Sequence, residues 1–184
     1  IYSSRRTEIP EFPNRDYWFK PKVLKELGII TACVGEVDDL DTRDFFKVCL
    51  SSIIKEVSNA DPKFLYALAI SKKMRANKHL RHVNALDTFK NRVMELTPKM
   101  IEFSKKCPRD TFVKVIGKDA RAIELPDGSV DLAITSPPYL NAVDYPRAHQ
   151  LELYWLGLWK GKLGDLKKFY IGTCLLYTSD AADE

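Results

Sequence analysis

A continuous apolar segment, VDLAIT at residues 130–135, ends abruptly at Ser-Pro-Pro-Tyr, residues 136–139. It shows no polar alternation after Asp131, which is typical of a strand that is covered on both faces. A second strand is predicted from TFVKVIG at 111–117, and ELPDGS at 124–129 predicts a turn. Strands buried on both faces occur in α/β proteins, where helices cover the sheet. The segment therefore predicts an α/β fold.

Helices are predicted before these strands. Pro21 suits the first turn of a helix that ends before Gly35, with one apolar face made by Val23, Leu24, Leu27 and Ile30. Asp41 or Thr42 can cap a second helix that runs to Val57, with an apolar face of Phe46, Leu50, Ile53 and Val57. The residues SNADP end this helix, and Pro62 can open another.

The segment 71–107 is strongly basic. It holds ten Lys and Arg residues against Asp87, Glu95 and Glu102. An apolar helical stripe runs through it, made by Phe89, Val93, Leu96, Met100 and Phe103. Because Pro98 lies inside this stripe, we expect either a kink or two helices, the second capped by Thr97.

The composition limits the class of protein. A chain of 184 residues suffices for one domain with a core. The longest apolar run, residues 64–70, is too short to cross a bilayer. Cys33, Cys49 and Cys107 show no CxxC spacing, so we expect reduced thiols, no metal site and a cytoplasmic protein.

The residues CLLYTSDAADE at 174–184 resemble the translated read-through of a sequencing adapter. The alternative is a natural acidic tail of small residues. In either case we set the tail aside in reasoning about the fold. Without its three acidic residues the formal net charge rises from +4 to +7.

The motif at 136–139 suits an exocyclic amino group on a planar ring. Two prolines stiffen the loop and remove two backbone donors, which leaves carbonyl oxygens to accept. The Ser136 hydroxyl and the Pro137 carbonyl can each accept an amine N–H, and Tyr139 can stack on the ring. A base within a duplex must be flipped out to reach such a loop, at a cost of a few kcal/mol. The alternative is a rigid turn after a strand.

These residues resemble a known family. TSPPY resembles the Asp/Asn/Ser-Pro-Pro-Tyr signature of amino-methyltransferases, and residues 117–157, GKDARAIELPDGSVDLAITSPPYLNAVDYPRAHQLELYWLG, resemble a group of site-specific DNA methyltransferases. Residues 43–61, RDFFKVCLSSIIKEVSNAD, resemble a helical segment of the same enzymes. The resemblance implies a partial Rossmann-like methyltransferase sheet with a helical insertion. It divides the chain into a mainly helical part at 1–110, a catalytic part at 111–173 and the tail at 174–184.

The resemblance also implies a cofactor and site residues. The cofactor is S-adenosyl-L-methionine, with Asp119 near its adenine end. The target amine is held by Ser136, Pro137, Pro138 and Tyr139, and the methyl group passes in line without a covalent enzyme intermediate. Four further residues are expected to line the base pocket or position the DNA backbone: Asn141, Asp144, Tyr145 and Arg147.

The family's glycine-rich cofactor loop is not found in this sequence. The eight glycines contain no Gly-x-Gly pair. The resemblance implies that the loop lies upstream of Ile1, so we expect this chain alone to bind S-adenosylmethionine weakly and to be inactive.

The resemblance implies N4 of cytosine rather than N6 of adenine as the target, because the Ser variant at position 136 is typical of N4-cytosine enzymes. It also implies double-stranded DNA as the substrate and a role in restriction–modification or phage defence, with a cognate restriction endonuclease as a possible partner. Three alternatives stay open: an RNA acceptor, a glutamine acceptor (disfavoured by Ser136), and a non-catalytic nucleic-acid-binding module. The basic run at 71–107 is as compatible with a solvated helix face as with a DNA contact. We expect His79 and His82 to be surface residues rather than metal ligands. We expect a cluster of aromatic residues to lie in the core rather than form a stacking platform: Tyr154, Trp155 and Trp159.

Overall fold

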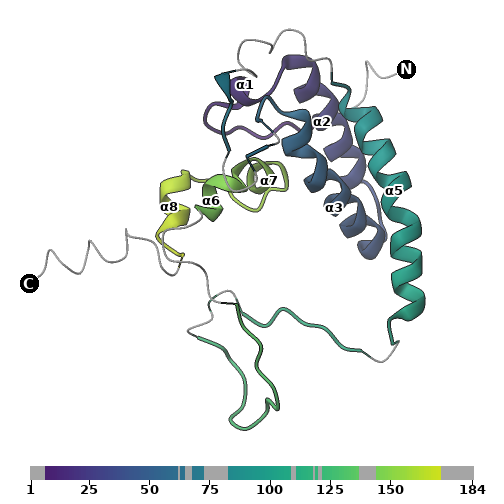
Figure 1. Cartoon of the computed structure of the whole chain (residues 1–184), viewed down its shortest axis with the longest axis vertical. Coiled ribbons are helices and arrows are strands. Elements are labelled where there is room, and N and C mark those ends of the chain that lie inside the picture. Colours follow the sequence, from purple (N-terminus) through teal and green to yellow (C-terminus); the bar gives the residue numbers. More distant parts are fainter. Residues whose placement is uncertain are drawn as a thin grey trace, which may run out of the picture.

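The computed structural model describes residues 7–61, 63–64, 68–72, 83–108, 111–117, 119, 122–136 and 144–170. Within these residues all regular structure is helical. The helices are α1 (Arg15–Trp18), α2 (Pro21–Gly35), α3 (Leu40–Val57), α5 (Ala85–Lys106), α6 (Tyr145–Ala148), α7 (Gln150–Trp155) and α8 (Leu163–Lys167). The long helices α2, α3 and α5 pack side by side, and the short helices α6–α8 lie together beside them (Figure 1).

Helices α2 and α3 form as their sequences predict. Pro21 occupies the first turn of α2, and the predicted apolar face is buried. Helix α3 ends at Val57 as expected. Its N-cap is Asp39 rather than Asp41 or Thr42: the Asp39 carboxylate accepts the backbone N–H of Thr42 at 2.8 Å. The predicted helix opening at Pro62 lies outside the described residues.

Helix α5 is one continuous helix that includes Pro98, so the prediction of two helices is wrong. Thr97 does not cap a second helix, because its hydroxyl donates to the carbonyl of Val93 at 2.7 Å, one turn earlier. The actual N-cap is Asn84, whose side chain accepts the N–H of Asp87 at 3.1 Å. Of the predicted stripe, the first half is partly buried, whereas Met100 and Phe103 are exposed because α5 extends past the core.

The core joins the helical body to α7. Ile53 and Leu151 are completely buried, and α7 packs against α3. Aromatic contacts hold the N-terminal segment against α7. Phe19 contacts Trp155 edge-on, with 5.8 Å between ring centroids, and Phe12 stacks on Tyr154 at 4.8 Å between centroids. The prediction that Tyr154 and Trp155 are core residues is confirmed.

The predicted α/β fold and its partial Rossmann-like sheet are wrong for the described chain. Residues 111–117 and 122–136 form no strand, and they extend away from the helices (Figure 1). Val115 and Ile134, expected in a sheet interior, are 88% and 87% exposed. A strand needs hydrogen-bonded neighbours and a covering layer, and an isolated pair of strands is marginal in water. Here the long helices bury their apolar faces against one another instead.

Among the described residues, no helix is both long and apolar enough to cross a membrane.

Candidate functional site

The motif at 136–139 is only partly described. Ser136 closes the extended segment 122–136, and its side chain is exposed. Pro137, Pro138, Tyr139 and Asn141 lie outside the described residues. The exposure of Ser136 leaves its position open to a ligand, as a base-binding role requires.

The chain after the motif returns to the helical body at α6. The Asp144 carboxylate caps this helix by accepting the N–H of Arg147 at 3.2 Å, and it also pairs with the ammonium group of Lys167. Tyr145 is 36% exposed and the Arg147 side chain is exposed. The structure therefore brings Asp144, Tyr145 and Arg147 together on α6, and gives Asp144 a structural partner.

Buried side chains hold helix α6 against the protein body. Pro146 and Ala148 are buried between the exposed residues, and α7 follows directly with Leu151 in the core. The first described element after Ser136 is therefore a helix packed against the protein body.

Asp119, the predicted cofactor contact, lies apart from these helices in sequence. Its side chain is half-buried, and its backbone carbonyl accepts the N–H of Ala122 at 3.1 Å. The described contacts do not join it to Ser136 or to α6.

A buried carboxyl group lies on α7. One oxygen of Glu152 is enclosed without a hydrogen-bond partner among the described residues. Burial raises the pKa of Glu152 above its ordinary value of 4.5, and the nearby charges of His149 and Lys55 oppose this shift.

A cavity of about 510 Å³ lies between the N-terminal segment, α2, α3 and α7. Apolar and aromatic side chains dominate its lining, including Leu50, Trp155 and Trp159. It contains none of the predicted site residues, so it is not the candidate base-binding site.

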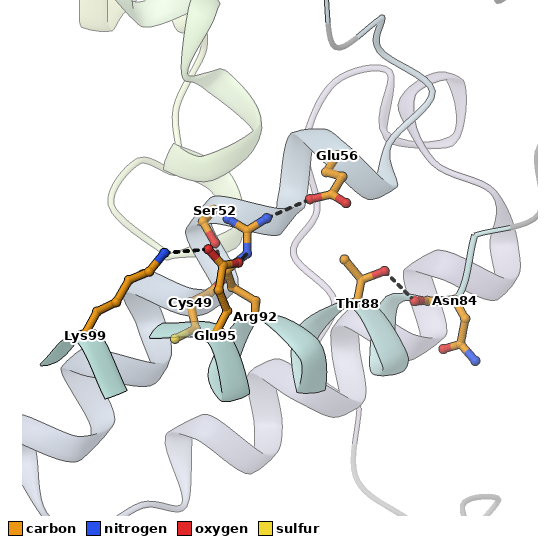
Figure 2. A network of polar contacts seen from close by, with 8 residues as sticks. All are labelled: Cys49, Ser52, Glu56, Asn84, Thr88, Arg92, Glu95 and Lys99. Carbon is orange, nitrogen blue, oxygen red and sulfur yellow. Dashed lines mark hydrogen bonds and ion pairs between the residues drawn. The ribbon is translucent and has the colours of Figure 1, made fainter. Parts of the chain in front are cut away.

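Three of the five basic residues of α5 form ion pairs with neighbouring acids. Figure 2 shows Arg92 between Glu56 of α3, at 3.0 Å, and Glu95, at 3.5 Å. Lys99 pairs with Glu95 at 2.7 Å. Lys106 pairs with Glu102 at 2.7 Å. Lys90 and Lys105 are the two cations of α5 without an ion-pair partner among the described residues.

Two lysines that the sequence analysis does not single out carry free charge. Lys160 and Lys162 are exposed, and no carboxylate of the described chain lies within 4.0 Å of either ammonium group. The signal was present in WKGKLGDLKK at 159–168, where four lysines accompany one aspartate.

Comparison with known proteins identifies distant relatives. No protein-family model matches the chain, and no solved structure matches it. It is 28% identical over 163 residues to the type II methyltransferase M.MvaI of Kocuria varians, covering 83% of this chain and 35% of that enzyme. It is 35% identical over 81 residues to the type II methyltransferase M.BsoBI of Geobacillus stearothermophilus, covering 42% of this chain and 16% of that enzyme. The chain thus spans about a third of M.MvaI, and it is a distant relative of type II methyltransferases.

Proposed function

We propose that this chain is part of a site-specific DNA methyltransferase, which transfers the methyl group of S-adenosylmethionine to the exocyclic amine of a flipped base. N4 of cytosine is favoured over N6 of adenine, and the setting is restriction–modification or phage defence. TSPPY at 135–139 carries the proposal. A continuous match to 83% of 184 residues must include these positions, so the motif lies within the region similar to M.MvaI.

The chemistry of the motif supports an amine acceptor. The Ser136 hydroxyl and the Pro137 carbonyl would accept the two N–H groups and direct the nitrogen lone pair toward the methyl donor, a contribution of positioning and electrostatics. Stacking on Tyr139 would contribute about 1–3 kcal/mol and offset part of the cost of flipping the base. The exposure of Ser136 is compatible with this role.

The cofactor supplies a methyl group on a sulfonium centre, but the described residues do not make a complete site for it. Asp119 is the single candidate contact, and the sequence contains no Gly-x-Gly pair. The steps assigned to this chain are therefore those on the substrate side: accepting the amine, stacking the base and holding the loop.

Variants of the complete protein test the substrate side. Tyr139→Ala should lower methyl transfer by about 5- to 160-fold, since it removes a stacking contribution of about 1–3 kcal/mol. Tyr139→Phe, the matched control, keeps the ring and most of the rate. Radiolabelled methyl transfer to duplex DNA measures both. Equal rates for Tyr139→Ala and the unmodified protein would remove Tyr139 from the site.

Ser136→Ala should also lower the rate, because the amine loses one acceptor while the Pro137 carbonyl remains. The same methyl-transfer assay measures this change. A rate unaffected by Ser136→Ala would leave amine recognition to the backbone carbonyl alone.

A further inference from the structure

The unit formed by α6–α8 has an excess of positive charge that its own acids do not neutralise. Residues 144–170 contain five basic residues and three acidic ones. Asp144 pairs with Lys167, and Asp165 pairs with Lys168 at 3.2 Å. The third acid, Glu152, is half-buried on α7, and one of its carboxylate oxygens is enclosed. Three cations remain without an ion-pair partner among the described residues: Arg147, Lys160 and Lys162.

Two of these cations flank a tightly held turn. The Tyr154 hydroxyl donates to the carbonyl of Gly161 at 3.1 Å, and the indole N–H of Trp159 donates to the carbonyl of Lys162 at 3.1 Å. Tyr154 is itself buried and stacked on Phe12. The backbone that carries the two lysines is therefore fixed to the core.

Gly161, at the centre of this turn, lies close to the Trp159 ring. A β-carbon at Gly161 would lie 3.1 Å from Cζ2 of the Trp159 ring, closer than most side-chain contacts allow. Lys160 and Lys162 thus stand on either side of a residue that packs directly on an aromatic ring.

The third cation is linked to this unit through α6. Helix α6 packs against α8, and the pair between Asp144 and Lys167 joins the two. Arg147 follows on α6, close in sequence to the motif that ends at Tyr139. Arg147 therefore lies on the first described helix after the candidate base site, whereas Lys160 and Lys162 lie just before α8.

The geometry points to a phosphate-binding surface for double-stranded DNA made by Arg147, Lys160 and Lys162, which holds the DNA backbone. This inference rests on the proposed function, because a DNA base as the methyl acceptor identifies DNA as the polyanion that the surface binds. Arginine and lysine contacts to phosphate position a protein on DNA without reading its sequence. They also make binding salt-dependent, because each contact releases counterions.

Helix α5 is the competing candidate, and its charges argue against it. Three of its five cations already have carboxylate partners: Arg92, Lys99 and Lys106 (Figure 2 shows the first two). Lys90 and Lys105 have none among the described residues. They are separated by about 22 Å along the helix axis at 1.5 Å per residue. These two lysines make a matched control for the surface on α6–α8.

The test is the salt dependence of DNA binding by the 184-residue chain. Fluorescence anisotropy with a labelled duplex of about 20 base pairs gives the binding constant at several salt concentrations. The triple variant Arg147→Gln, Lys160→Gln, Lys162→Gln should reduce the slope of log K against log salt by about 2.7, or about 0.9 for each contact. Between 50 and 200 mM salt, the unmodified chain should lose about 40-fold more affinity than the triple variant.

The double variant Lys90→Gln, Lys105→Gln should leave the slope unchanged. An unchanged slope in the triple variant would overturn the inference, as would an equal effect of the control, a lack of binding to duplex DNA, or tighter binding to single-stranded RNA. Circular dichroism checks folding. Should the triple variant fail to fold, Lys162→Gln alone must still reduce the slope by about 0.9.

Methyl transfer by the complete protein separates this inference from the proposed function. If the triple variant has the reduced salt slope but neither the unmodified complete protein nor any variant transfers methyl groups, the phosphate-binding surface is retained and the proposed enzyme is rejected. Methyl transfer with an unchanged slope would retain the enzyme and reject the surface.

Discussion

Glu26 joins two helices through a buried hydrogen bond. Its carboxylate, on α2, accepts the backbone N–H of Ala85 at 2.7 Å, the first residue of α5. Lys22 lies 3.6 Å away and supports the charge. The first N–H groups of a helix have no partner within the helix, so this contact satisfies one that would otherwise be buried without one. Apolar spacing cannot indicate such a bond, because 59 positions separate its two residues.

Glu26→Ala should lower the free energy of unfolding by about 1–3 kcal/mol, because the Ala85 N–H loses its acceptor. Urea denaturation followed by circular dichroism measures the change. Glu26→Gln, which keeps an oxygen acceptor, should lose less. Equal stability of the alanine variant and the unmodified chain would show that this bond does not hold α5 to α2.

Glu152 makes stability depend on pH. Because burial raises its pKa in the folded protein, the folded chain holds this proton more tightly than the unfolded chain does. Stability from this group is therefore present below the ordinary pKa of 4.5 and is lost as the pH rises through the raised folded value.

The Glu152→Gln substitution introduces a side chain that is neutral at every pH. It should therefore remove the loss of folding stability that occurs as the pH rises. The melting temperature of this variant should match that of the unmodified chain at about pH 4 and exceed it at about pH 7. Thermal unfolding across this range gives the comparison. A Gln variant that melts lower at neutral pH would mean that the charged carboxylate has a stabilising partner.

At the scale of elements, local signals predicted α2 and α3 because helix caps and apolar spacing there agree with the packing. Pro21 starts α2, and its apolar face meets α3 and α5. The predicted strands at 111–117 and 130–135 are not formed, because local apolar runs do not by themselves supply strand partners. Val115 and Ile134 favour strands only when neighbouring strands and a covering layer receive them. Neither the pairing nor the covering layer can be identified from the short apolar runs themselves.

The same substitution in two elements tests this difference. Ile53, on α3, is 0% exposed, whereas Ile134 is 87% exposed. Ile53→Ala should cost about 2–5 kcal/mol of stability, and Ile134→Ala less than about 0.5 kcal/mol. Chemical denaturation of both variants measures the two losses of unfolding free energy. Comparable losses at the two positions would place Ile134 in a packed interior and refute the exposed segment.

For the whole molecule, the amine-binding chemistry of the motif at 136–139 stays a prediction, and the structure describes the chain before and after it. Ser136 is exposed at the end of an extended segment, and α6 begins on the helical body soon after. Lys160 and Lys162 were not predicted, because their significance depends on which neighbouring acids are already paired. Ion pairs of this kind follow from packing and cannot be counted from composition.

Mapping of modified bases at single-base resolution tests the central claim most directly. The complete protein is expressed in a bacterial host that lacks its own DNA methyltransferases, beside its Tyr139→Ala variant. The account predicts methyl groups on an exocyclic amine, N4 of cytosine, within one defined sequence, and their loss in the variant. Unmodified host DNA despite abundant folded protein, or methylation at C5 of cytosine, would contradict it.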